Sequence, residues 1–165
     1  MIDLDAATVL LQWATGGLFF LWVTGRRREV GIGYGWTMRI TFGVMTAGAV
    51  AVGVLFESQP VRDLFGALML AATVAAMAVS VVRRKAGVAG QRGTEERRSA
   101  RVAAMTGIDK DEQTFSDGPE FPAHLDLLAP LLGVVALVAG GINAGDPAWL
   151  SVARVLIGAL FLGAI

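Results

Sequence analysis

The residues best suited to acid–base chemistry in this sequence are His124, the only histidine, and Asp126 two positions later. A histidine beside a carboxylate could act as a general base that the acid orients. Residues two positions apart do not share a helix face, so this pair is poorly arranged for that role. No cysteine is present, and no serine or second histidine completes a nucleophilic set. We therefore interpret Asp126 as an acid favourable near a helix N-terminus, and we predict no catalytic residues and no enzymatic activity.

A glycine-rich segment could hold a phosphate group through its exposed backbone N–H groups. It reads Gly31-Ile32-Gly33-Tyr34-Gly35 and follows the basic triplet Arg26, Arg27 and Arg28. A dinucleotide-binding fold would need a strand before the glycines, whereas a long apolar run precedes them. The three arginines could contact lipid headgroup phosphates. We favour a flexible turn at the membrane surface, with Tyr34 and Trp36 as headgroup anchors, and predict no cofactor.

An acidic segment has spacings like those of a calcium loop, with candidate ligands at Asp109, Asp111, Gln113, Asp117 and Glu120. Such a loop requires glycine at its sixth position, where this sequence has Thr114, and Pro119 interrupts its end. We therefore interpret the segment as a solvated acidic loop and predict no metal site.

Five charged residues that fall within or beside long apolar runs are candidates, because charge there is costly and is by default a sign of function: Arg39, Arg62, Asp63, Asp126 and Arg154. All five lie toward the ends of their runs, whereas a proton or ion pathway would need such groups at mid-depth. Matching depths predict that Arg39 approaches Asp126 and that Arg154 approaches Asp63 or Glu57. The alternative is that each arginine reaches headgroup phosphates instead. Gln12, near the middle of the first run, could donate an inter-helix hydrogen bond.

The elements that would hold these residues are long apolar helices. The chain has 165 residues, 55% of them hydrophobic, and a mean hydropathy of +0.61. A membrane-spanning helix needs roughly 20 apolar residues, and five runs qualify, at about 6–25, 36–57, 63–82, 125–144 and 148–165. We predict an all-α polytopic membrane protein. The last run ends without a basic anchor, which favours a product that continues past Ile165.

One polar segment of about 40 residues, 83–123, separates the third and fourth runs. Within it, Thr94 followed by two acids and then three arginines predicts a helix start, and Gly107 predicts its end. Basic residues directly follow the first and third runs, at 26–28 and 83–85, whereas the turns on the opposite side, 57–61 and 145–147, carry only Glu57 and Asp146 as charged residues. The positive-inside rule then puts the N-terminus outside a bacterial inner membrane and the 83–123 segment in the cytoplasm.

Small residues recur four apart along several runs, a spacing that lets helix backbones approach closely. The clearest positions are Gly43, Ala47, Ala71, Ala75 and Gly140. We expect them to pack against other helices of the chain or of a partner, and we expect the third helix to bury its alanines rather than expose them to lipid.

Two segments of the first quarter, Leu11–Gly17 and Trp22–Gly31, resemble the start of uncharacterised actinobacterial multi-pass membrane proteins. The resemblance carries no catalytic motif. It implies a location in an actinobacterial cell membrane and implies no activity.

The missing catalytic sets and the small-residue stripes lead to one functional hypothesis: a non-catalytic accessory or scaffolding subunit of a larger membrane assembly, of lipid-transport or respiratory type. Its expected partners are membrane lipids and other membrane subunits, not nucleic acid. One alternative is a small oligomeric transporter or channel, with a polar cavity lined by Gln12, Thr15, Thr46 and Thr73. Another is a lipid-modifying membrane enzyme, for which Arg39, His124 and Asp126 are the candidates.

Overall fold

The structure, a computed structural model, describes residues 5–26, 32–84, 86, 90–107, 119–145 and 147–165. Six α-helices and no strands occur among these residues. The helices are α1 (Ala6–Arg26), α2 (Ile32–Phe56), α3 (Pro60–Val82), α4 (Gln91–Thr106), α5 (Leu125–Asn143) and α6 (Ala148–Gly163). The all-α class predicted from the sequence is present.

Four of the helices, α1, α2, α3 and α5, are long and apolar enough to cross a membrane. This architecture is consistent with an all-α polytopic membrane protein. The fifth predicted run forms α6, which has 16 residues and is therefore about 24 Å long. A full span needs about 30 Å. The structure thus has four long apolar helices and one shorter apolar helix, and the number of membrane spans stays a prediction.

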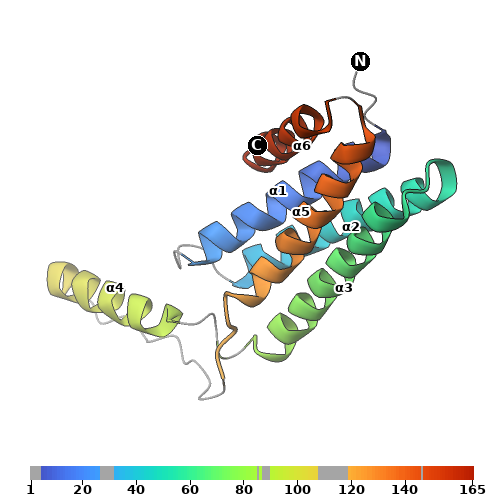
Figure 1. Cartoon of the computed structure of the whole chain (residues 1–165). Coiled ribbons are helices and arrows are strands. Elements are labelled where there is room, and N and C mark those ends of the chain that lie inside the picture. Colours follow the sequence, from blue (N-terminus) through green and yellow to red (C-terminus); the bar gives the residue numbers. More distant parts are fainter. Residues whose placement is uncertain (1–4, 27–31, 85, 87–89, 108–118, 146) are drawn as a thin grey trace.

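The five apolar helices form one bundle (Figure 1), in which α1 packs against α2, α5 and α6, and α3 packs against α2 and α5. The bundle core includes Leu11, Ala14, Met69, Leu137 and Val155. We call the two ends of the bundle the Arg39 end, where α1 and α3 finish, and the Arg62 end, where they begin.

Small residues allow α1 and α6 to touch through their backbones. A Cβ atom added to Gly16 would overlap the carbonyl oxygen of Ala159 and lie 3.0 Å from the Cα of Gly163. Any larger side chain at this crossing would push the helices apart. The α1–α6 contact therefore has the close approach that small-residue spacing predicts.

Three helix boundaries differ from the predicted ones. Helix α2 begins at Ile32, so the glycines expected in a turn are largely helical. Glycine costs only about 1 kcal/mol in a helix, and no proline stops this one. Helix α3 begins at Pro60, a residue suited to the first helical turn. Helix α4 begins at Gln91 rather than Thr94 and ends, as predicted, at Gly107, whose φ is 67°.

Ala71 and Ala75 on α3 are exposed within this chain, so their packing against a partner helix stays a prediction. The face that α3 buries instead carries Met69, Thr73, Ala76 and Ser80. Residues 69, 73, 76 and 80 share one side of a helix, and 71 and 75 lie on the other. On α2, Gly43 is half-buried and Ala47 is exposed, whereas Gly140 on α5 is buried.

Two buried arginine clusters as the candidate functional site

The first cluster is an ion pair between α2 and α5. Arg39 donates from Nε to Oδ1 of Asp126 at 2.8 Å and from Nη2 to Oδ2 at 2.7 Å. The two side chains are only 5% and 8% exposed. Such a two-pronged contact between a planar guanidinium and a carboxylate is strong and geometrically specific. The predicted approach of Arg39 to Asp126 is therefore present, as an inter-helix pair rather than a contact with headgroups.

A shell of side chains closes around this pair. The Ser80 hydroxyl accepts hydrogen bonds from Arg39 Nη1 at 3.2 Å and from Trp36 Nε1 at 2.9 Å. The ring of Phe121, which is 1% exposed, lies 4.7 Å from the guanidinium carbon of Arg39. An aromatic face over a cation adds attraction while excluding water. Asp126 directs both oxygens to Arg39, and His124 is exposed, so the hypothetical acid–base pair of His124 and Asp126 does not form.

Beside this shell, Glu120 connects the segment before α5 to residues that flank α3 and α4. Its carbonyl oxygen accepts a hydrogen bond from Arg83 at 3.0 Å, and its Oε2 accepts one from the backbone N–H of Gly90 at 2.8 Å. Arg83 follows α3 directly and Gly90 precedes α4. Glu120 thus joins the end of α3 to the start of α4 at the Arg39 end.

The second cluster surrounds Arg62 on α3, which is 2% exposed. Its Nε donates to Oδ1 of Asp63 at 3.0 Å and its Nη2 donates to the carbonyl oxygen of Glu57 at 2.7 Å. Its Nη1 forms an ion pair with Asp5 and a hydrogen bond with the Thr8 hydroxyl at 3.4 Å. One guanidinium therefore connects the start of α1, the α2–α3 turn and the start of α3.

Both carboxylates of this cluster also cap helices. Asp5 Oδ1 accepts the backbone N–H of Thr8 at 2.6 Å, and Asp63 Oδ2 accepts the backbone N–H of Gln59 at 2.9 Å. Burial alone raises the pKa of Asp5, but the hydrogen bonds from Thr8 and the contact with Arg62 outweigh burial and leave that pKa below its ordinary value. The ionised carboxylate is thus the form that the fold stabilises.

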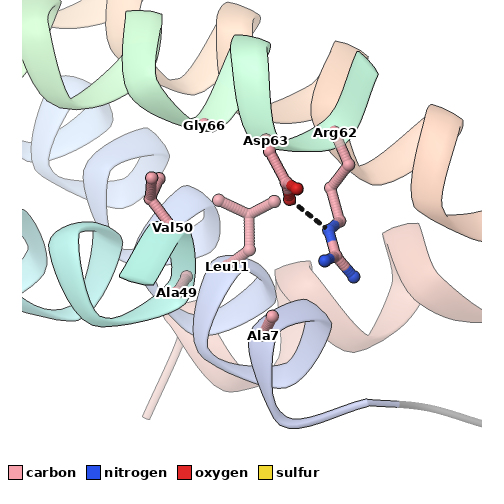
Figure 2. A pocket seen from close by; sticks show the side chains of 7 residues that line it. All are labelled: Ala7, Leu11, Ala49, Val50, Arg62, Asp63 and Gly66. Carbon is pink, nitrogen blue, oxygen red and sulfur yellow. Dashed lines mark hydrogen bonds and ion pairs between the residues drawn. The ribbon is translucent and has the colours of Figure 1, made fainter. Parts of the chain in front are cut away.

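A small cavity of about 10 Å³ adjoins Arg62 and Asp63 between α1, α2 and α3 (Figure 2). That volume is close to the space one water molecule needs. The backbone of α2 comes near as well: a Cβ on Gly53 would lie 2.6 Å from Oδ1 of Asp63. Glycine at this position leaves room for the carboxylate.

The Arg62 cluster corrects the second predicted ion pair. Asp63 pairs with Arg62, not with Arg154, which is exposed and forms no ion pair with any residue the structure describes. The signal for Arg62 was present in the sequence, because Arg62 and Asp5 both lie at the ends of apolar runs on the same predicted side. The predicted pairs joined only charges within or beside the apolar runs of α2, α3, α5 and α6. Asp5, which precedes the first run, was not included.

The polar residues proposed as a channel lining are bonded within the bundle. Gln12 Nε2 donates to the carbonyl oxygen of Val155 at 2.9 Å, which is an inter-helix hydrogen bond as predicted. The Thr15 hydroxyl contacts the Met69 sulfur at 3.7 Å. The remaining two threonines, Thr46 and Thr73, donate to carbonyl oxygens one turn earlier in their own helices.

Two predicted groups lie outside the part of the chain that the structure describes. The first is the arginine triplet, of which Arg27 and Arg28 and the side chain of Arg26 are not described. The second is the acidic segment from Asp109 to Asp117. Among the described residues, no group of three or more histidine or acidic side chains is arranged to hold a metal ion.

Comparison with known proteins provides no assignment: no protein-family description, no curated protein and no solved structure matches this chain.

Proposed function

We propose that this chain is a non-catalytic scaffolding or accessory subunit of a larger bacterial membrane assembly. One observation carries the proposal: both buried arginines are bonded to groups of the chain itself, Arg39 to Asp126 and Arg62 to Asp5 and Asp63. Charged side chains inside membrane helices mark ion or substrate pathways or pair with one another, and these two guanidinium groups are paired. Charges fixed between helices instead hold a framework in one arrangement.

The surface of the α2–α3 pair supports a protein partner. Ala67, Ala71 and Ala75 are exposed along α3, on a surface we call the alanine face. Small residues give little hydrocarbon contact to lipid but let the backbone of a second helix approach closely. A transmembrane helix with small residues of its own, in a lipid-transport or respiratory complex, would fit this face.

The direction of insertion belongs to the same proposal. Arg83 and Arg84 follow α3 at the Arg39 end, and Asp5 and Glu57 lie at the Arg62 end. The positive-inside rule favours a cytoplasmic Arg39 end in a bacterial inner membrane.

Site-specific photo-crosslinking in cells tests the proposal. A photoreactive amino acid at Ala71, on the alanine face, should give a discrete adduct with one other membrane protein. The matched control is Ile157, an exposed residue on α6, which should give lipid adducts only. Adducts of this chain with itself at Ala71, together with solute flux in vesicles that contain only this chain, would favour an oligomeric transporter instead. Lipid adducts alone at both positions would contradict the proposal.

A further inference from the structure

Helix α4 differs from the rest of the molecule in composition and in packing. It is the polar helix of the six, and it does not pack against another described helix. Figure 1 shows it beside the Arg39 end, pointing sideways away from the bundle rather than continuing its long axis. A helix that leaves the end of a membrane bundle sideways extends roughly along the membrane surface.

The start of α4 is fixed at the level where α3 ends. Gly90, its N-cap residue, donates its N–H to Glu120, whose carbonyl oxygen in turn accepts from Arg83. The neighbouring Phe121 is buried against Arg39. The base of α4 is therefore attached at the membrane boundary, and the remainder of the helix extends from that point.

One side of α4 carries three of its four arginines. Arg97, Arg101 and Met105 are spaced four apart, and Arg98 and Val102 form an adjacent pair of the same spacing, so all five share one side of the helix. We call this side the arginine face. Its three arginines are exposed, as are Val102 and Met105, at 38% and 72%. None of the three forms an ion pair with a described residue, and Glu96 lies on the opposite side.

We propose that the arginine face of α4 lies on an anionic membrane surface and binds the phosphates of acidic phospholipids. Guanidinium groups match phosphate in charge and geometry, and the apolar side chains between them can enter the boundary between headgroups and acyl chains. Each basic residue near such a surface strengthens binding about fivefold. Attachment to a membrane bundle and the apolar residues on the face favour a lipid surface over nucleic acid. This inference goes beyond the scaffolding role and does not depend on it.

The absence of cysteine in the sequence allows a direct test with the full chain. We would attach an environment-sensitive fluorophore to V102C, on the arginine face, and to A100C, on the far side, as the matched control. Each variant is reconstituted into vesicles of phosphatidylcholine alone or with about one-third phosphatidylglycerol. The expected result is a blue-shifted emission for V102C only with phosphatidylglycerol, reversed by high salt because the attraction is screened.

Replacement of the arginines separates binding from folding. The variant R97Q/R98Q/R101Q should weaken surface binding roughly 100-fold and abolish the shift, whereas R97K/R98K/R101K should retain most of it. Equal V102C emission in both vesicle types, or a shift that persists in the glutamine variant, would overturn the proposal. A shift produced by added RNA and not by phosphatidylglycerol would overturn it in favour of a nucleic-acid surface.

Discussion

The Arg39 end and the Arg62 end each bury one arginine, but they neutralise it differently. Arg39 has a single acidic partner, Asp126, 87 residues away on another helix. Arg62 has two, Asp63 beside it and Asp5 at the start of α1, and its cluster holds one more carboxylate than guanidinium. The first arrangement joins α2 to α5 directly. Apart from this ion pair, the two helices are connected mainly through α1 and α3, each of which packs against both. The second organises the starts of α1 and α3, where its acids act as caps.

This difference indicates how the stability of each end should respond when one of its charges is removed. At the Arg39 end the two charges balance, so removal of both leaves neither one buried alone. Among the described residues at the Arg62 end, the arginine is the only cation between two acids, so its removal leaves two partly buried carboxylates without a counter-ion. An unpaired buried charge costs far more than a missing pair.

The largest effect should therefore come from R62M. We expect it to lower the free energy of unfolding by about 3–5 kcal/mol, because Asp5 and Asp63 lose their common partner. Reversible unfolding in mixed detergent micelles measures the change. The matched control is R154Q, which removes an exposed arginine on α6 and should change stability by less than about 0.5 kcal/mol. Equal, small effects of the two variants would mean that the Arg62 cluster contributes little.

A smaller effect should follow from breaking the pair at the Arg39 end. D126A should cost about 3 kcal/mol in the same unfolding measurement, because Arg39 stays buried without its acid. The double variant R39M/D126A should be more stable than D126A, because both charges are then absent, and R39M completes the cycle. Additive losses in the double-mutant cycle would show that the two residues act independently and would remove the distinction between the two ends.

The smallest effect concerns acid. Because the pKa of Asp5 is lowered in the folded chain, its contribution to stability is complete above the unfolded pKa of about 3.9 and is lost as the pH falls through the lower folded value. Stability measured from pH 7 to pH 3 should accordingly decline only toward the acid limit. The D5N variant should show a shallower decline over that range. An identical decline in D5N would exclude Asp5 as a source of the acid sensitivity.

The sequence predicted the Arg39–Asp126 pair because both charges lie at one depth, on the second and fourth apolar runs, and a buried charge has few alternatives to a partner. It could not select the buried face of α3, because two neighbouring stripes of small residues run along this helix, one through Ala71 and Ala75 and one through Ala76 and Ser80. What decides between them is the positions of Met69, Thr73 and Ser80 against α2 and α5, which only the packed bundle specifies. The sideways course of α4 could not be predicted from the sequence either. It depends on the contacts of Glu120, and the segment that contains Glu120 has no clear hydrophobic periodicity.

The contact between α1 and α6 has a consequence for biosynthesis. Gln12 finds its acceptor on Val155, 143 residues later in the chain. At a synthesis rate of about 5–20 residues per second, that acceptor emerges roughly 7–29 seconds after Gln12 does. During this interval the amide of Gln12 and the bare backbone of Gly16 have no α6 to cover them. Helix α1 of the nascent protein must therefore wait for α6, and any factor that shields α1 in the meantime would act as a temporary substitute for α6.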